Sequence, residues 1–318
     1  MQGKQPLAPV VLFVYNRLEH TRRTIEALSN NTLASESRLY IFSDAPPNAE
    51  AVKAVEAVRD YIHTLNAADL FGEVTIELAK ENKGLADSII AGVSKVMQLH
   101  GKAIVMEDDL LSAPDFLSFM NDALAFYEKD ESVGSISGYS PLKKMPKHYT
   151  HSIWKACRTS SYGWATWHSR WKEVSWKIDD FEEFRKDKKA RRAFDACGSD
   201  RFDRLRRQLE VGANSWSIRF GYWQFRAGKY TIFPSLTRIQ NIGWDGSGVH
   251  KTSNIKSFNT DIKSKPMPYF LEYVDPDPVV IAQLKKIYSG SAPGRIARYL
   301  RNNGFENLER MLRKMAGR

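Results

Sequence analysis

The stretch Ala103-Ile-Val-Met-Glu-Asp-Asp109 decides the fold, because a short apolar run ends abruptly in three acidic residues. Such a run, bounded by polar residues, is typical of a buried strand. Neighbouring carboxylates repel one another unless a cation or hydrogen bonds neutralise them, and no basic residue stands beside these acids. Carboxylate oxygens suit Mg²⁺ or Mn²⁺, which often bridge protein acids and substrate phosphates. A polar turn between a strand and a helix is the alternative.

The residues after the acids predict a helix. Ser112-Ala-Pro-Asp115 has the features of a helix start, with Ser112 as the N-cap and Asp115 as the acid of a capping box. The acids are therefore expected in a loop between a strand and a helix. In open α/β sheets, ligands bind beyond the carboxyl ends of the strands.

Strands and helices alternate through the first half of the chain. Apolar runs predict strands over residues 9–15, 39–42, 74–78, 103–106 and 132–136, and helical spacing of apolar residues predicts helices over 19–28, 51–65 and 85–97. Such alternation indicates parallel strands with crossover helices on both faces. The sequence therefore predicts an α/β fold.

The second half of the chain differs, because it holds all eight Trp residues. A charged helical region is expected over 181–211, a helix over 216–227 and a strand over 230–233. Prolines between 266 and 278 mark an extended linker, which a helix over 279–288 and a basic tail follow.

The composition, with 42% hydrophobic and 26% charged residues, is ordinary for a soluble globular protein. No apolar run approaches the roughly 18–20 residues that span a bilayer, and Val10–Val14 is too short for a signal-peptide core. Cys157 and Cys197 lack CxxC spacing, so neither a disulfide framework nor a zinc site is expected. These features favour a location in the reducing cytoplasm.

The net charge of +10 is concentrated in residues 285–318, which carry nine Lys and Arg against two Glu. This basic tail suggests an anionic membrane surface or a polyanion as its partner. Leu308, Met311 and Met315 fall on one helical face. The tail is therefore expected to be a peripheral membrane anchor, a helix docked on the rest of the chain, or a solvated helix.

Polar residues follow the predicted strands. Asn16 and Arg17 come after the first strand, and Arg17 could hydrogen-bond a base or a phosphate. Asp44 comes after the second strand and could accept a hydrogen bond from a uracil-like N–H. Lys83, in the loop before the helix over 85–97, could meet a phosphate. Helix caps and surface turns are the alternative for each.

The second half offers three further candidates. Glycines in the loop 241–250 suit a backbone that approaches an anion. His250 in this loop could bind a metal or donate to a phosphate. Trp164 and Trp167 could stack on a sugar ring, although aromatic clusters more often pack a core.

These motifs together resemble a family. The block Ile104-Val-Met-Glu-Asp-Asp-Leu-Leu-Ser-Ala-Pro-Asp-Phe116 is similar to the metal-binding block of GT-A-fold glycosyltransferases, especially the N-acetylglucosaminyltransferase I type. The similarity extends to residues 11–17, 42–44, 162–167 and 241–250. The last two segments also resemble bacterial family-2-like sugar transferases of surface-polysaccharide pathways.

The resemblance implies a GT-A fold, in which a mostly parallel central sheet flanked by helices fills residues 1–255. Residues 1–140 would form the nucleotide-sugar half and 141–255 the Trp-rich acceptor half, followed by a linker and basic helical tail over 256–318. The donor would contact Asn16, Arg17, Asp44, Lys83, Asp108, Ser247 and Gly248. Asp109 would bind Mn²⁺ or Mg²⁺ with His250 as a further ligand, and Trp164 and Trp167 would bind the acceptor.

The general base departs from the family's pattern. An inverting transferase needs a carboxylate to deprotonate the acceptor hydroxyl. The resembled enzymes have an Asp before the Trp that aligns with Trp216, where this chain has Asn214. Glu210 is the nearest acid in the sequence, with Asp179 and Asp180 as alternatives.

The sequence therefore predicts a metal-dependent, inverting hexosyl- or N-acetylhexosaminyltransferase. Its donor would be a nucleotide-sugar, with UDP favoured, and its acceptor a glycan or lipid-linked glycan at the inner face of the cell membrane, in surface-polysaccharide or glycoconjugate synthesis. A nucleic-acid partner is not expected. The alternatives are a catalytically degenerate sugar-nucleotide-binding protein, which Asn214 suggests, and a basic polyanion-binding module, which the tail suggests.

Overall fold

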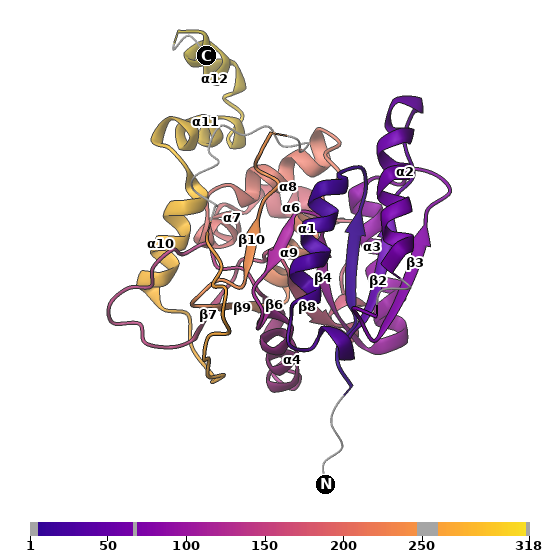
Figure 1. Ribbon diagram of the computed structural model, residues 1–318. Coiled ribbons are helices and arrows are strands. Elements are labelled where there is room, and N and C mark those ends of the chain that lie inside the picture. The colour runs from indigo at the N-terminus through magenta and orange to yellow at the C-terminus, as the bar shows by residue number, and fades with distance from the viewer. Residues whose placement is uncertain (1–5, 66–68, 247–259, 316–318) are drawn as a thin grey trace.

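The computed structural model describes residues 6–65, 69–246 and 260–315, and at its centre is a sheet of eight strands (Figure 1). The strands lie in the order β3-β2-β1-β4-β8-β6-β9-β7. Their bounds are β1 Val10–Val14, β2 Arg38–Ser43, β3 Glu73–Leu78, β4 Lys102–Glu107, β6 Val133–Ser137, β7 Ile153–Ala156, β8 Trp164–Trp167 and β9 Tyr230–Pro234.

Most of these strands are parallel. β1 pairs in parallel with β2 and β4, β2 with β3, and β6 with β9. β8 is antiparallel to β4 and β6, and β7 is antiparallel to β9. The predicted α/β fold, with a mostly parallel central sheet flanked by helices, is confirmed. The carboxyl ends of β1, β2 and β4 consequently meet at one edge of the sheet.

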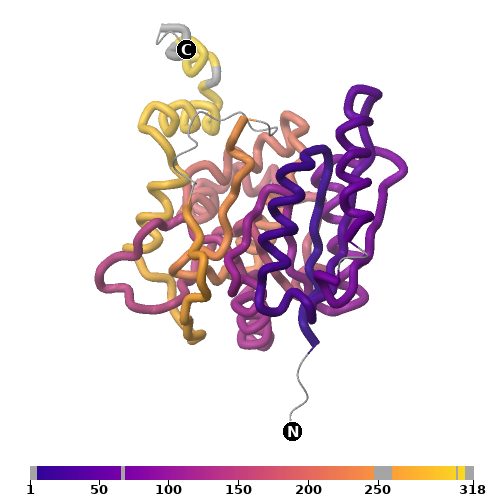
Figure 2. The backbone as a smooth tube through the Cα atoms, in the orientation of Figure 1, coloured from indigo at the N-terminus to yellow at the C-terminus, as the bar shows by residue number. Residues whose placement is uncertain are grey.

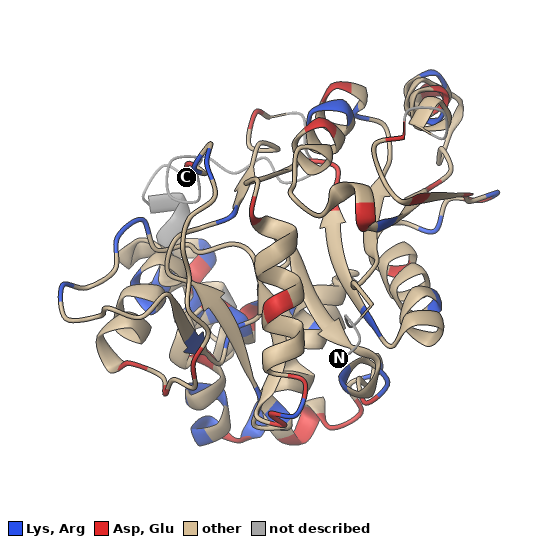
Figure 3. Cartoon of the chain, turned by 60° about the horizontal axis from the view of Figure 1, so that its bottom comes forward, with Lys and Arg blue, Asp and Glu red and all other residues tan. Residues whose placement is uncertain are grey.

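Helices cover both faces of the sheet (Figure 1). Their bounds are α1 Leu18–Ser29, α2 Ala49–Thr64, α3 Leu85–His100, α4 Phe116–Phe126, α5 His168–Trp171, α6 Phe181–Lys186, α7 Lys188–Phe194, α8 Arg201–Glu210, α9 Trp216–Arg226, α10 Pro278–Ser289, α11 Ala292–Asn302 and α12 Glu306–Met315, with 3₁₀ turns η1 Ala34–Glu36 and η3 Asp195–Cys197. Figure 3 shows that charged residues concentrate on helices and loops, while the central strands carry few.

Strand β1 shows why its sequence is a continuous apolar run. Leu12 belongs to a core that includes residues of α1, α2 and α4 on one face of the sheet. Val11 and Phe13 belong to a second core, with residues of α3 and α9, on the other face. Because side chains alternate along a strand, a strand that is covered on both faces needs apolar residues at every position.

A second, two-stranded sheet follows the acids and corrects the predicted start of α4. β5 (Leu110–Ser112) pairs antiparallel with β10 (Ile239–Asn241), so Ser112 is in a strand and does not cap a helix. α4 begins at Phe116, and Asp115 makes no side-chain cap hydrogen bond. Its carboxylate instead accepts from Arg238 Nε at 3.0 Å. Arg238, 123 positions away in the sequence, therefore replaces the local capping box as the partner of Asp115.

The expected linker packs against the sheet layer. The Tyr269 ring lies edge-on to Phe119 of α4, with ring centroids 5.3 Å apart, and the Tyr127 hydroxyl donates to the Glu272 carbonyl. The expected boundary near residue 255 lies outside the described residues. Figure 2 shows the described chain ending in helices α11 and α12, far from its beginning near the N-terminus.

The two cysteines are joined, which corrects the expectation from their spacing. Cys157 follows β7, Cys197 ends η3, and the two form a disulfide across 40 positions of sequence. The tertiary fold brings them together, because η3 and the end of β7 both contribute to a small core with α10. Within the described part of the chain, no helix is long and apolar enough to cross a membrane.

Candidate functional site

The acid cluster lies at the carboxyl end of β4, beside the end of β1. Glu107 ends β4, and Asp108 and Asp109 form the turn before β5. The side chains of Asp108 and Asp109 are only 7% and 15% exposed. Arg17 Nη2 donates to Asp108 Oδ1 and, at 2.8 Å, to Asp109 Oδ2. No basic residue is next to the acids in the sequence. Arg17, 91 positions before Asp108, supplies the positive charge.

Burial and mutual repulsion oppose the negative charges of the acids, and Arg17 offsets this only in part. Burial raises the pKa of Glu107 to about 8, and the charges of Asp109 and Asp108 add to this effect. Burial also raises the pKa of Asp108 to about 6, against the opposing influence of Arg17. Burial opposes the charge on Arg17, but the two aspartates outweigh it and raise the pKa of the guanidinium. Three acids therefore share one cation, which leaves room for a second positive charge.

The turn after β10 closes over Asp109. The Ile242 N–H donates to the Asp109 carbonyl at 2.9 Å. A Cβ atom at Gly243 would lie 2.1 Å from Asp109 Oδ2, so only glycine fits at this approach. His20 Nε2 of α1 lies 3.1 Å from Asp245 Oδ2. Gly243 and His20 were not among the predicted residues, although the glycines of loop 241–250 pointed to a close backbone approach.

Three predicted residues of this loop, Ser247, Gly248 and His250, lie outside the described residues. The described part of the loop, through Gly246, lies on the acid cluster. Within this part, Ile242 and Gly243 approach Asp109, and the role expected for the loop in binding an anion stays a prediction.

Asp44 organises the loop before α3. Its carboxylate accepts from the backbone N–H groups of Lys83 and Gly84 at 3.0 and 2.8 Å, and from Asn82 Nδ2 at 3.2 Å. Gly84 has φ +74°, a conformation that glycine adopts at no steric cost. The structure thus brings Asp44 and Lys83 together, through the backbone of Lys83. Asn82 was missed, because nothing in the sequence pairs it with a residue 38 positions away.

Tyr15 lies at the end of β1, near Asp44. Burial raises the pKa of the Tyr15 hydroxyl, and the charge of Asp44 raises it further. Asn16 is exposed beside Arg17 at the end of β1. Tyr15, Asn16 and Asp44 therefore stand at the carboxyl ends of the adjacent strands β1 and β2.

The carboxylates of Asp108 and Asp109 fit a divalent cation. Both direct an oxygen to a single point, which Arg17 Nη2 occupies. One or two carboxylates of this kind commonly hold Mg²⁺ when substrate phosphates complete the coordination. Among the described residues there is no group of three His, Cys, Asp or Glu that could hold a metal ion without such help.

Asn214, at the expected position of the general base, contacts a carboxylate. Its Nδ2 donates to Asp87 Oδ2 at 3.2 Å, and its Oδ1 accepts from Arg219 Nη2 at 2.7 Å. Asp87 lies in the first turn of α3, directly after the loop that Asp44 holds. No local pattern could indicate this contact, since the two residues are 127 positions apart.

The predicted base Glu210 is not free to act as one. Its two carboxylate oxygens lie 2.6 Å from Arg206 Nη1 and 3.1 Å from Arg185 Nη1. It also lines a cavity between α6, α8 and α11 that contains none of the acid cluster. Asp180 is likewise engaged, since it accepts from the Tyr222 hydroxyl at 2.9 Å.

Trp164 and Trp167 do not present a ring to an acceptor, which corrects their predicted role. They are 1% and 2% exposed. Trp164 stacks on Trp216 with centroids 4.8 Å apart, and Trp167 Nε1 donates to the Leu124 carbonyl at 3.2 Å. The aromatic residues of the second half therefore pack the core between β8 and its covering helices.

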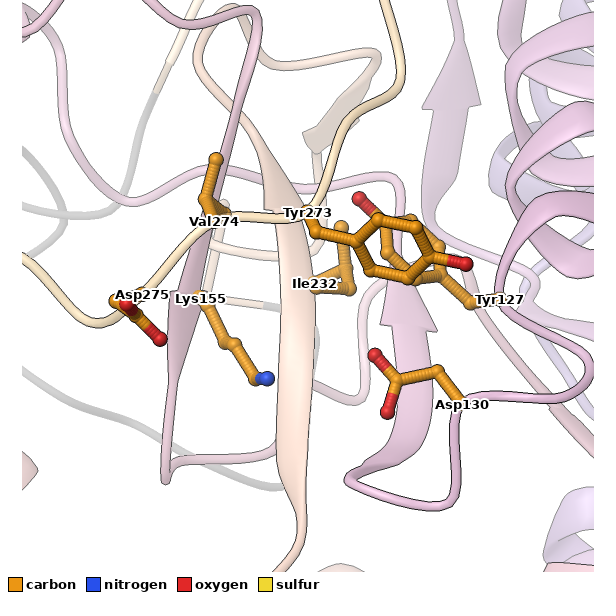
Figure 4. A pocket seen from close by; sticks show the side chains of 7 residues that line it. All are labelled: Tyr127, Asp130, Lys155, Ile232, Tyr273, Val274 and Asp275. Atoms are coloured by element: carbon orange, nitrogen blue, oxygen red, sulfur yellow. The ribbon is translucent and has the colours of Figure 1, made fainter.

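A small cavity of about 140 Å³ lies at the opposite end of the sheet from the acids (Figure 4). Tyr127, Asp130 and Lys155 line it, near the start of β6. None of the predicted site residues contributes to it.

Known proteins are similar to parts of this chain. No protein-family model matches it. The Arabidopsis thaliana alpha-1,3-mannosyl-glycoprotein 2-beta-N-acetylglucosaminyltransferase is 24% identical over 179 residues, which are 54% of this chain and 40% of that protein. The chain thus matches less than half the length of this relative. The predicted resemblance to an N-acetylglucosaminyltransferase I is confirmed.

Two solved structures are also similar. The mannosyltransferase PcManGT from Pyrobaculum calidifontis, in complex with GDP-Man and Mn²⁺, matches 44% of this chain and 40% of its own, with 18% identity and a TM-score of 0.31. S. aureus TarS matches 52% of this chain and 30% of its own, with 11% identity and a TM-score of 0.35. Neither overlap is close enough to establish a shared fold.

Proposed function

We propose that this chain is a GT-A glycosyltransferase, which moves a sugar from a nucleotide-sugar donor to a glycan acceptor. One observation carries the proposal. The oxygens of Asp108 and Asp109 converge on one cation at the carboxyl end of β4, where β1, β2 and the 241–246 turn also meet. The sequence relative is named as an enzyme that transfers N-acetylglucosamine.

The donor would lie across the ends of β1, β2 and β4, in the half of the chain up to about residue 140. Asp44, beside Tyr15, accepts from the base of a uridine nucleotide, and Lys83 and Asn16 contact its ribose or phosphates. Arg17 exchanges its aspartate partners for a phosphate oxygen of the donor. A Mn²⁺ or Mg²⁺ ion held by Asp109 and Asp108 would offset the charge that develops on the departing nucleoside diphosphate.

We assign Asp87 as the carboxylate that takes the proton from the acceptor hydroxyl, in an inverting transfer. It contacts Asn214, which aligns with the family's base, and its exposed position leaves the second oxygen open to an acceptor. Asp87→Asn should therefore abolish sugar transfer while nucleotide affinity is kept. Loss of nucleotide binding in this variant, measured by calorimetry, would instead give Asp87 a binding role.

The acceptor would be a glycan or lipid-linked glycan of a surface-polysaccharide or glycoconjugate pathway, met at the inner face of the cell membrane. The tail supports this location, since Tyr299, Phe305, Leu308 and Met311 are 65%, 53%, 41% and 51% exposed. These apolar side chains are available to a lipid surface.

A thermal-shift screen of nucleotide-sugars, with and without Mn²⁺, tests the proposal, because a ligand that binds only the folded state raises its stability. We expect a uridine nucleotide-sugar to give the largest shift, and only with the metal. Donor hydrolysis then separates a working enzyme from a degenerate binding protein. The absence of any metal-promoted shift, together with strong heparin binding, would favour a polyanion-binding module.

A further inference from the structure

A second cavity, of about 370 Å³, lies between the helices α6–α8 and the tail helix α11. Six basic residues line it: Arg185, Lys186, Lys188, Arg191, Arg206 and Arg301. We call this cavity the basic pocket. Its only acidic lining residue within the described part of the chain is Glu210. Figure 1 shows α11 at this end of the molecule, on the side of α7 and α8, with α12 beyond it.

Half of these cations are balanced by acids of the same region. Glu210 pairs with both Arg185 and Arg206. Arg301 Nη2 lies 3.4 Å from Asp203 Oδ2, and Arg301 Nη1 lies 2.9 Å from Glu309 Oε1. These pairs fix the wall of the basic pocket, because they join α8 to α11 and α11 to α12.

Among the residues that the structure describes, the other three cations have no carboxylate partner. The ammonium groups of Lys186 and Lys188 make no hydrogen bond or ion pair with any described residue. Arg191 donates only to oxygens without charge, the Asn302 carbonyl at 2.9 Å and Asn303 Oδ1 at 3.5 Å. Its guanidinium also lies over the Phe202 ring, 4.8 Å from the centroid. Three positive charges therefore face one cavity without counter-charges.

We propose that the basic pocket binds a phosphate-bearing group of two or more negative charges, and that the headgroup of an anionic lipid supplies it. Guanidinium and ammonium groups together are the usual ligands of phosphate. The exposed Tyr299 and Phe305 flank the segment Arg301–Gly304 of the pocket wall, so an acyl chain has an apolar surface beside its headgroup. This site is separate from the acid cluster and does not depend on sugar transfer.

Calorimetry with pyrophosphate tests the anion site directly. The full chain is titrated in EDTA, so that no metal ion bridges the anion to Asp108 or Asp109. We expect binding, and a loss of about tenfold in affinity for Lys186→Ala/Lys188→Ala, since each removed charge near a phosphate weakens its binding. The control is Lys53→Ala/Lys172→Ala, which removes the same charge from exposed positions elsewhere. No binding by the wild type, or equal loss in both variants, would overturn the proposal.

Vesicle co-sedimentation identifies the source of the phosphate. Vesicles of phosphatidylcholine alone are compared with vesicles that also contain phosphatidic acid. At about 1 kcal/mol for each basic residue at a lipid surface, the double variant should partition roughly 30-fold less onto the anionic vesicles. Weakened pyrophosphate binding with unchanged vesicle partitioning would overturn the lipid assignment in favour of a soluble phosphate.

Discussion

Arg17 is the residue that most changes the interpretation of the site. Its position after β1 could be predicted. Its partners could not, because the sequences of β1 and β4 do not indicate that these strands are neighbours in the sheet. The guanidinium holds one oxygen of Asp108 and one of Asp109 close together. The Arg17 guanidinium thus supplies one positive charge to the aspartates, and the metal ion of a bound donor would supply a second.

Asp109→Ala should remove metal-promoted nucleotide binding without unfolding the chain. Asp109 is partly exposed in a turn, so its loss leaves the core of β4 intact. Calorimetric titration of UDP with Mn²⁺ measures the effect, and Asp60→Ala, at an exposed position of α2, is the control. Unchanged Mn²⁺-dependent affinity in the folded variant would refute the assignment of Asp109.

Asp44→Ala should weaken uridine nucleotides by about 1–3 kcal/mol, the cost of losing a hydrogen bond to a charged group. The variant also frees the loop that the Asp44 carboxylate holds. Asp44→Asn keeps one accepting oxygen and separates the two effects. Equal nucleotide affinity for the wild type and both variants, measured by calorimetry, would rule out Asp44 as the reader of the base.

Removing Arg17 should destabilise the metal-free protein more than the metal-bound one. Arg17→Ala leaves two largely buried carboxylates without their donor, which costs about 2 kcal/mol in unfolding free energy. Mn²⁺ should restore part of this loss by binding the folded state. Urea unfolding with and without Mn²⁺ measures both effects, with Arg23→Ala as the control. A variant as stable as the wild type in EDTA would contradict the expectation.

Among the elements, the long ones could be predicted and the short ones could not. β1, β2 and β4 contain apolar runs of four or five residues, and α2 and α3 repeat apolar residues over 16 positions. β5 and β10 have three residues each and exist because they pair with each other across the chain. The local sequence does not indicate a distant partner strand, which is why the prediction of a capping box at Ser112 was wrong.

Helix α8 begins at an ion pair that should make its stability depend on pH. Arg158 Nη1 and Nη2 each donate to an oxygen of Asp200 at 2.8 Å. Burial alone would raise the pKa of Asp200, but Arg158 outweighs it and lowers the pKa to about 2 from 3.8. The folded state therefore binds fewer protons than the unfolded state between these values, and the contribution of Asp200 is lost as the pH falls from about 4 to about 2.

Asp200→Asn should accordingly lower the unfolding free energy by about 2 kcal/mol at pH 7, and by much less near pH 2. Chemical unfolding at both pH values measures the difference, with Asp60→Asn as the control for an exposed aspartate. A loss that is the same at pH 7 and pH 2 would show that the charge of Asp200 does not stabilise α8.

At the scale of the whole molecule, contacts between distant parts of the chain complete the site. The acids and Asp44 could be predicted, because each directly follows an apolar run. Gly243 approaches Asp109, and Asn214 contacts Asp87. Both contacts join the two halves of the chain, and no pattern in the sequence of either half indicates them. The disulfide between Cys157 and Cys197 is of the same kind.

That disulfide should stabilise the whole molecule. It closes a loop across 40 positions, and in the chain-entropy description such a loop contributes about 4 kcal/mol. Cys157→Ser/Cys197→Ser should lower the unfolding free energy by up to this amount, and reductant should lower that of the wild type to match. Denaturant midpoints that coincide for the oxidised wild type and the double variant would contradict this expectation.

The closing of the 241–246 turn over Asp109 has a consequence for synthesis on the ribosome. Arg17 is made before the acids, so its guanidinium is already present when Asp108 and Asp109 emerge. Gly243 follows Asp109 by 134 positions, which takes roughly 7–27 s at ordinary translation rates. During that interval the nascent chain holds Arg17 and both aspartates but not the turn that covers Asp109, so the site is completed only by the later half.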